Sequence, residues 1–159
     1  MTPPDPNPTY RRAYRVQWAD LDAIGHLRNS AYLDYAVDTR FAYLAEQGFT
    51  AADFAAAGIG PVVLLDEIRY RRELRFQEDF TVTFLLAGLS ADGSRLRLHN
   101  RFYRADGSFS AAVTSEGLWF DLKERRRIVP PEKLLAILRA MEHTEDYGEI
   151  LGPPEMPEG

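Results

Sequence analysis

One long helical segment, followed by a run of strand patterns, is the feature that most narrows the folds open to this chain. From Ser30 to Gln47, apolar residues recur at helical spacing in a broad stripe, with acidic residues between them. Asn29 or Ser30 can cap the start of this helix, and Gly48 suits the position just past its end. With a rise of ~1.5 Å per residue, the predicted helix is about 27 Å long.

Strand patterns fill most of the chain on either side of this helix. The sequence ADGS occurs at 91–94 and again at 105–108, and predicts hairpin turns because glycine tolerates the positive φ that such turns require. We therefore predict that four strands after the helix form an antiparallel meander. A ten-residue strand spans about 33 Å, so this sheet can curl along the helix. The candidate strands are residues 10–18, 62–74, 80–89, the stretch between the two ADGS sequences, and 110–121.

The length of the chain and its two ends predict one domain with a flexible segment on each side. A chain of 159 residues can bury one core. Short helices are predicted at 50–57 and directly after Pro130-Pro131, because proline suits the first helical turn. We expect residues 1–9 to be a flexible arm, residues 10–145 to be the domain, and residues 146–159 to be a flexible tail.

Charge and composition disfavour several classes of protein. The net charge of −5 argues against a general binder of nucleic acid or of anionic membranes. The chain has no cysteine, which removes disulfides, thiolate metal sites and cysteine nucleophiles. The N-terminus has no signal pattern, and no apolar run approaches the ~20 residues that cross a bilayer. We expect a cytoplasmic protein that binds neither nucleic acid nor membrane.

The densest group of polar residues lies between Trp18 and Tyr35, directly before and into the long helix. From Asp20 to Tyr32 it reads D-x-D-x-x-G-H-x-x-N-x-x-Y. No serine stands in G-x-S-x-G and no G-x-G-x-x-G follows a strand, so neither a serine-triad hydrolase nor a dinucleotide fold is supported. His99 and His143 show no ligand spacing with His26, so no metal site is expected.

This motif, in the order strand, loop, long helix and four strands, resembles the hotdog-fold acyl-CoA thioesterases, in particular the 4-hydroxybenzoyl-CoA thioesterase branch. The resemblance extends from Tyr10 to Asp121. It implies an α+β hotdog fold, in which an antiparallel sheet of about five strands wraps around a long central helix. It also implies hydrolysis of an acyl-CoA, or of an acyl group on a carrier protein, to free acid and thiol without a cofactor. The expected assembly is a homodimer or homotetramer, with active sites at the subunit interface.

The resemblance assigns roles to individual residues of the motif. Asp22 matches the catalytic carboxylate, which acts as nucleophile or general base, and the backbone N–H near Asn29 matches the oxyanion site at the helix N-terminus. His26 is the third candidate, through hydrogen bonds to the substrate or to the loop. Asp20 is expected to order the loop. Arg28 stands where many relatives have the first asparagine of G-H-V-N-N, which bears on substrate preference.

Several alternatives stay open on the sequence alone. Glu67 is a further carboxylate candidate, on a strand expected near the helix, and the arginines from 69 to 104 form either a solvated sheet face or contacts to CoA phosphates. A non-catalytic acyl-CoA-binding or sensing module would keep the pocket and release no thiol. A hotdog hydratase or dehydratase would need a different histidine–carboxylate arrangement, which the sequence does not show.

Overall fold

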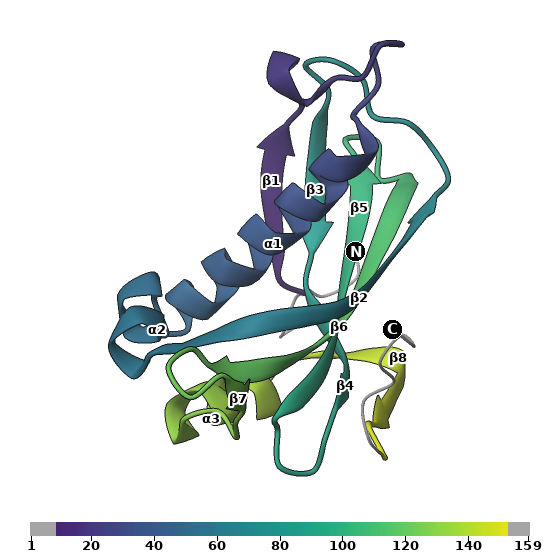
Figure 1. Ribbon diagram of the computed structural model, residues 1–159. Helices are drawn as coiled ribbons and strands as arrows, with labels where there is room; N and C mark the ends of the chain where they lie inside the picture. Colours follow the sequence, from purple (N-terminus) through teal and green to yellow (C-terminus); the bar gives the residue numbers. More distant parts are fainter. Residues whose placement is uncertain (1–8, 153–159) are drawn as a thin grey trace, which may run out of the picture.

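A curled sheet packs around one long helix in the computed structural model, which describes residues 9–152 (Figure 1). Residues 1–8, which include most of the expected arm, and residues 153–159 lie outside the described part. The elements in chain order are β1 (Arg11–Arg15), the 3-10 helix η1 (Trp18–Asp20), α1 (Asn29–Glu46), α2 (Ala51–Ala57), β2 (Ile59–Tyr70), β3 (Asp79–Thr83), β4 (Leu85–Leu89), β5 (Arg95–Arg104), β6 (Phe109–Asp121), β7 (Arg126–Arg127), α3 (Glu132–Arg139) and β8 (His143–Glu149).

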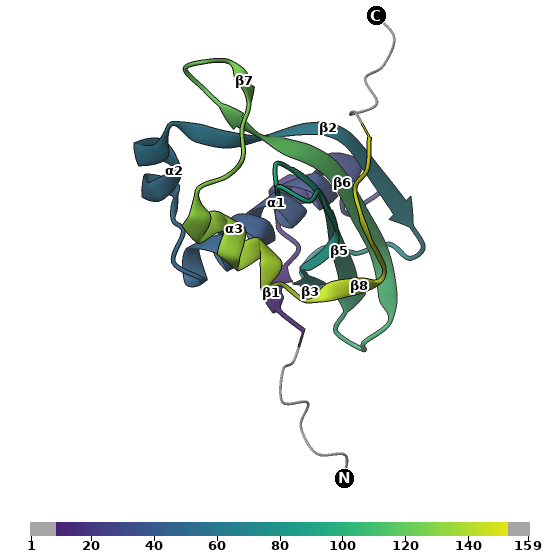
Figure 2. The same cartoon turned by 90° about the horizontal axis from the view of Figure 1, so that it is seen from below.

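The main strands follow one another across the sheet as β2, β6, β5 and then β3 with β4, and β1 lies beyond β3. These pairs are antiparallel, and β8 adds to β4 in parallel. The predicted strand 80–89 is divided at Phe84 into β3 and β4, which both pair with β5. Seen from below, the sheet curls around α1 (Figure 2). The predicted hotdog fold is therefore confirmed.

One predicted pairing is wrong. β2 does not begin the meander next to β3 but pairs with β6, from Ile59 opposite Asp121 to Tyr70 opposite Ala111. Only β3 with β4, β5 and β6 form the meander, and residues 71–78 carry the chain across to β3. The two strands of the β2–β6 pair come very close at Gly117, where a Cβ atom would lie 2.6 Å from the Val62 carbonyl oxygen.

The start of α1 also differs from the prediction. Asn29 is the first helical residue and Arg28 is the N-cap, with no side-chain hydrogen bond at the cap. The prediction that Asn29 or Ser30 caps the helix is therefore wrong. The preceding loop is held by its own hydrogen bonds and leads the chain directly into the helix. At the other end, Gly48 has φ +98° just past the helix, as predicted. The second helix is capped by Thr50 and Asp53, also as predicted.

The buried face of α1 separates two parts of the core. Tyr32 and Ala36 in its first half pack with Phe80 and Phe102 of the sheet. Leu44 near its end packs with a second group of buried side chains, which includes residues of α2, β6 and α3. The outer face of the same helix exposes Val37 and Phe41, so α1 is apolar on more than its core side.

The turns and the C-terminal segment complete the sheet. Gly93 and Gly107 both have positive φ, and the preceding aspartates accept the backbone N–H of Ser94 and Ser108, so both predicted hairpin turns are confirmed. β8 was not predicted: it continues to Glu149, so the expected domain boundary at residue 145 falls inside a strand. The polar sequence of β8 does not show a strand pattern, and its strand conformation comes from pairing with β4. Within residues 9–152, no helix is both long and apolar enough to span a membrane.

Candidate active site

The loop that carries Asp22 is closed by its own hydrogen bonds. The Asp22 N–H donates to the His26 carbonyl at 2.8 Å, and Leu21 forms a bridge with Leu27. In return, one carboxylate oxygen of Asp22, Oδ1, accepts the N–H groups of Ile24 and His26, both at 3.0 Å. Gly25 takes φ +79° at the tip of the loop, a conformation that suits glycine. One side of the Asp22 carboxylate is thus fixed, and within residues 9–152 no hydrogen bond engages its Oδ2.

The loop is also fastened to the connection between β2 and β3. The Leu27 N–H donates to the Leu74 carbonyl at 2.7 Å, and His26 forms a backbone bridge with Arg75. The side chains of Leu27 and Leu74 are both buried in the core. His26 therefore orders the loop through its backbone, and its half-buried ring lies at the loop surface.

Asp20 and Arg28 join the loop to α1. Asp20 accepts hydrogen bonds from the Tyr35 hydroxyl and the Gln17 N–H, so its predicted structural role is confirmed. The Arg28 guanidinium donates to the Ala19 carbonyl at 2.8 Å and makes ion pairs with Asp20 and with Asp34 of α1. Burial, assisted by the Asp20 carboxylate, raises the pKa of Tyr35. Arg28, the residue that departs from the G-H-V-N-N version, is therefore part of the loop framework.

The first residues of α1 present backbone donors beside this loop. Asn29 and Ser30 are exposed at the helix start, where the first four N–H groups of a helix have no partner within the helix. The helix dipole adds a partial positive charge at the same end. Asp22 precedes these donors by a few residues, and the Arg28 N–H, which bonds to the Asp20 carbonyl at 2.8 Å, fixes the turn between them. The Ala31 N–H bonds to the Arg28 carbonyl at 3.0 Å, whereas within residues 9–152 no backbone hydrogen bond engages the N–H groups of Asn29 and Ser30. A carboxylate and these two donors therefore share one end of the molecule.

Tyr32 is buried in the first turn of α1, in aromatic surroundings that the sequence pattern did not reveal. Its side chain is buried against the rings of Tyr70 and Phe102, at centroid distances of 5.3 and 5.2 Å. Burial raises the pKa of Tyr32, and the charges of Tyr70, Glu73 and Asp22 add smaller effects in the same direction. Tyr32 is the last residue of the motif, but its spacing from Asp22 did not predict that β2 would bring Tyr70 against its ring.

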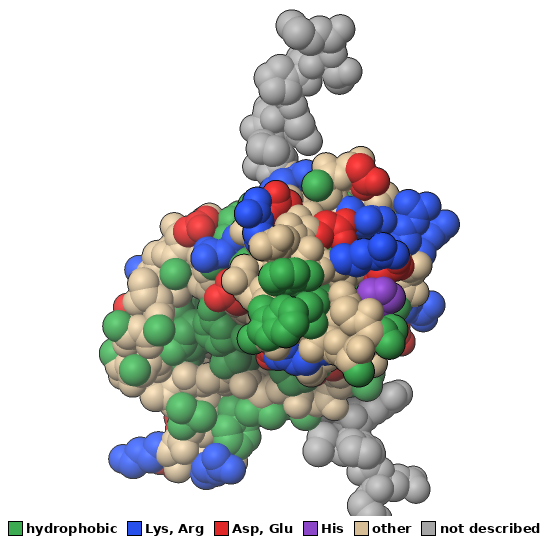
Figure 3. Space-filling view, turned by 90° about the horizontal axis from the view of Figure 1, so that it is seen from above, with side chains coloured by type: hydrophobic (Ala, Val, Ile, Leu, Met, Phe, Trp, Pro, Cys, Tyr) green, Lys and Arg blue, Asp and Glu red, His purple; other side chains and the backbone are tan. Residues whose placement is uncertain are grey.

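A group of hydrophobic side chains, with basic and acidic side chains around it, lies at this end of the molecule (Figure 3). The Trp18 side chain is 76% exposed and packs edge-on against Phe76, with ring centroids 5.6 Å apart. Arg71 and Arg72 are exposed on the connection to which the loop is fastened. Most of the sheet arginines are instead bound to acids, as expected of a solvated face. These pairs are Arg69–Glu67, Arg75–Glu73, Arg97–Glu116, Arg101–Glu145 and Arg104–Glu78. Glu67, the further carboxylate candidate, is thus engaged by Arg69.

An apolar cavity of about 390 Å³ lies further along α1, between that helix, the sheet and α3. Of its eleven lining residues, Arg40 alone is charged. Its guanidinium donates from Nε to Asn100 Oδ1 and from Nη2 to Ser115 Oγ, both at 2.8 Å, and Ser115 in turn donates to Asp66. Burial lowers the pKa of Arg40 to about 10, which leaves it charged at neutral pH. The lining residues are Val37, Arg40, Phe41, Leu44, Pro61, Val63, Phe84, Leu96, Leu98, Trp119 and Leu138.

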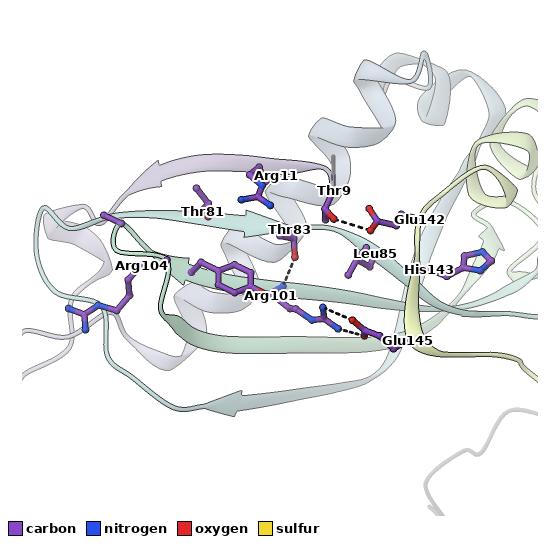
Figure 4. Close-up of a pocket in the computed structure, with 13 residues that line it drawn as sticks. Thr9, Arg11, Thr81, Thr83, Leu85, Arg101, Arg104, Glu142, His143 and Glu145 are labelled. Carbon is purple, nitrogen blue, oxygen red and sulfur yellow. Dashed lines mark hydrogen bonds and ion pairs between the residues drawn. The ribbon is translucent and has the colours of Figure 1, made fainter. Parts of the chain in front are cut away.

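A second cavity, of about 460 Å³, opens on the face of the sheet turned away from α1 (Figure 4). It is polar, and the Arg101–Glu145 ion pair at 2.7 Å crosses it from β5 to β8. The ion pair holds the pKa of Glu145 down to about 2. None of its lining residues belongs to the Asp22 loop or to α1. The sheet therefore separates this cavity from the candidate site.

Comparison with known proteins identifies the class to which this fold and loop belong. The model of the thioesterase-like superfamily matches residues 16–138, so the chain is a member of that superfamily. The predicted resemblance to hotdog acyl-CoA thioesterases is thereby confirmed.

Particular relatives agree with this assignment. Protein THEM6 of Xenopus laevis is 35% identical over 94 residues, which cover 59% of this chain and 44% of that protein, so the chain matches less than half of the relative's length. A hypothetical protein of Staphylococcus aureus, solved in complex with CoA, has a TM-score of 0.76 at 19% identity, covering 92% of this chain and 96% of that one. A 1,4-dihydroxy-2-naphthoyl-CoA thioesterase from Synechocystis has a TM-score of 0.75 at 14% identity, with 86% and 100% covered. At these identities the two structures establish a shared fold.

Proposed function

We propose that this protein hydrolyses an acyl-CoA, or a related acyl thioester, to the free acid and the thiol. The observation that carries the proposal is the position of Asp22: a carboxylate with one oxygen held by two N–H groups, in the loop that leads to the N–H donors of Asn29 and Ser30 at the start of α1. Membership of the thioesterase-like superfamily supports the reaction class.

In the proposed reaction, the backbone N–H near Asn29 donates to the thioester carbonyl oxygen as negative charge develops on it. The Oδ2 atom of Asp22 then has two possible roles. It attacks the carbonyl carbon, so that the C–S bond breaks, the thiolate leaves and water cleaves the resulting anhydride. Alternatively it removes a proton from water, the resulting hydroxide attacks the carbonyl carbon, and the C–S bond then breaks so that the thiolate leaves and is protonated to the thiol. His26 supports both routes by closing the loop that holds Asp22.

The decisive experiment compares the wild-type protein with Asp22→Asn in a thiol-release assay across a panel of acyl-CoAs. The amide keeps the shape of the side chain and removes its negative charge, so turnover should fall by at least about 100-fold, the usual scale of a lost acid–base or nucleophilic group. Thermal unfolding should change little, because Asp22 is exposed. An Asp22→Asn protein with near wild-type turnover would eliminate Asp22 as the reacting carboxylate. Binding of acyl-CoA without thiol release by the wild type would instead indicate a sensing module.

Single turnover in ¹⁸O water tests the nucleophilic role of Asp22. Label in the Asp22 carboxylate indicates an anhydride that water cleaves at the Asp22 carbon, whereas label confined to the product acid shows that water attacked the acyl carbon, as the general-base route requires.

The proposed assembly is a homodimer, or a homotetramer built from it, in the cytoplasm. Within residues 9–152, β2 pairs with β6 alone, and it exposes Val63 and Leu65. Val63 lines the apolar cavity together with Val37 and Phe41 of α1, which are also exposed. An unpaired strand edge with apolar neighbours favours pairing with a second copy. Sedimentation equilibrium tests this point, because a monomer at micromolar concentration would contradict it.

A further inference from the structure

The N-cap of α1 is an arginine, which cannot cap a helix in the usual way. An N-cap is ordinarily Ser, Thr, Asp or Asn, whose side-chain oxygen accepts the N–H of the second or third helical residue. The Arg28 guanidinium has N–H donors and no acceptor, and it makes no side-chain hydrogen bond at the cap. The side chain at this position therefore cannot engage the N–H groups of the first helical turn.

The N–H groups of the first turn show the effect of this cap. Ala31, the third helical residue, donates its N–H to the Arg28 carbonyl at 3.0 Å. Within residues 9–152, no hydrogen bond engages the N–H of Ser30, the second residue, or of Asn29, the first, and both residues are exposed. A side-chain acceptor at position 28 would compete for the Ser30 N–H. With arginine there, two adjacent N–H groups are available to a ligand oxygen.

The Arg28 guanidinium instead connects the first turns of α1 to the segment before the loop. Its positive charge opposes the helix dipole, and the carboxylates of Asp20 and Asp34, at 3.4 and 3.3 Å, offset this effect. It also donates to Ser30 Oγ at 3.0 Å and to the Ala19 carbonyl at 2.8 Å. Because the donors of a guanidinium lie in one rigid plane, these contacts fix the direction in which the helix starts.

Asp20 connects these contacts to Asp22, which follows it by two positions. The Asp20 carbonyl accepts the Arg28 N–H at 2.8 Å, and the Asp20 carboxylate accepts the Tyr35 hydroxyl of α1. The base of the loop is therefore bound to α1 by its backbone and by its side chains. A displacement of ~1 Å between reacting groups can reduce a rate about 100-fold. Arg28 is thus placed to control the position of Asp22 relative to the helix donors.

We infer that Arg28 is the positioning residue of an oxyanion site with two donors. Its guanidinium takes the place of a capping acceptor, fixes the first turn of α1 to the base of the Asp22 loop, and leaves the N–H groups of both Asn29 and Ser30 for the thioester oxygen. The inference rests on the proposed function, because that function supplies the oxygen. It also explains the departure from G-H-V-N-N, since asparagine at position 28 is an acceptor and arginine is not.

The test compares kcat, KM and melting temperature for the wild type, Arg28→Asn and Arg28→Lys, with the acyl-CoA of the panel that the wild type hydrolyses fastest. Arg28→Asn supplies an acceptor, so kcat should fall about 100-fold, the effect of one lost oxyanion donor, with little change in KM. Lysine has donors only, so Arg28→Lys should keep a kcat at least about tenfold above that of Arg28→Asn.

The melting temperatures separate positioning from a merely structural role. Asparagine is a favourable N-cap and lysine is not, so Arg28→Asn should melt no lower than Arg28→Lys although it is the less active variant. Loss of structure alone would place activity and stability in the same order. Arg15→Asn is the matched control: Arg15 is also an ion-paired surface arginine, bound to Asp79 away from the helix start, and its replacement should leave kcat at the wild-type value.

Amide hydrogen exchange at Ser30 distinguishes failure of this inference from failure of the proposed function. The Ser30 N–H should exchange more slowly in Arg28→Asn than in the wild type or Arg28→Lys, whether or not any thioester is hydrolysed. If the wild type hydrolyses no acyl-CoA, the proposed function fails, and slower exchange still supports the effect of Arg28 on the helix donors. Three results would overturn the inference: wild-type kcat in Arg28→Asn, equal loss of kcat in Arg28→Asn and Arg28→Lys, or unchanged exchange at Ser30.

Discussion

Replacing Arg40 by methionine tests how the long helix is fixed to the sheet. The guanidinium is 6% exposed and bonds to Asn100 and Ser115, which are 0% and 2% exposed. Arg40→Met leaves Asn100 Oδ1 buried without its donor, at a cost of ~1–3 kcal/mol, while Ser115 keeps its bond to Asp66. The lost bonds to a charged donor contribute ~1.5–3 kcal/mol each, and relief of the buried charge offsets part of this loss. We expect the free energy of unfolding to fall by ~2–4 kcal/mol.

Urea unfolding at one fixed protein concentration measures this change, because self-association would otherwise shift the midpoint. With an m-value of ~2 kcal/mol/M, the expected loss lowers the midpoint by roughly 1–2 M. Arg69→Met is the control: its side chain is 79% exposed in a surface ion pair, so it should change stability by less than ~1 kcal/mol. An Arg40→Met protein within ~0.5 kcal/mol of wild type, the usual range of neutral surface changes, would refute the reasoning. It would mean that the bonds from Arg40 to Asn100 and Ser115 contribute little to holding α1 against the sheet.

Two further changes test the sheet. Gly117→Ala should destabilise the protein by ~1–3 kcal/mol, because the added Cβ would meet the Val62 carbonyl at 2.6 Å. Gly148→Ala, where the Cβ meets nothing within 4 Å, should leave the melting temperature unchanged, and equal melting temperatures for both variants would contradict this. Arg101 lowers the pKa of Glu145 to about 2, so their pair stabilises the fold above pH ~4.5 and is lost as the pH falls toward 2. The melting temperature of Glu145→Gln should therefore change less than that of the wild type between pH 5 and pH 2. An equal change in both proteins would exclude this ion pair as a cause of the loss of stability in acid.

The sequence predicted the elements of local origin well. The helical stripe predicted α1 to within one residue at each end, and the Asp-Gly pairs predicted both hairpin turns. The strand order could not be predicted equally well, because alternation of side chains defines the faces of a strand and not its neighbour. β2 illustrates this limit, since its partner β6 lies some fifty residues later in the chain. β8 escaped prediction because the pairing of its backbone with β4 requires no apolar pattern.

The candidate site shows the same division between local and distant contacts. The motif spacing brought Asp22, His26 and Asn29 to one loop and one helix start, because residues so close in sequence share a neighbourhood in any fold. The spacing did not reveal that Tyr70 packs on Tyr32 or that Leu74 accepts the Leu27 N–H, because the path of β2 and of the connection after it determines both contacts. The buried position of Arg40 could not be predicted for another reason. A charged residue in a helix is ordinarily expected to face solvent, and the buried partners of Arg40 lie sixty or more residues away in the sequence.

The hydrogen bond from Leu27 to Leu74, with the adjoining bridge from His26 to Arg75, has a consequence for how this site can vary. The loop that carries Asp22 takes its orientation from a segment forty-seven positions away, which contains none of the motif. A change of length or sequence in residues 71–78 would change the orientation of the Asp22 carboxylate relative to the start of α1, although all residues of the motif stayed the same. Two proteins with identical motifs can therefore differ in reactivity, and the connection between β2 and β3 is the first place to look for the cause.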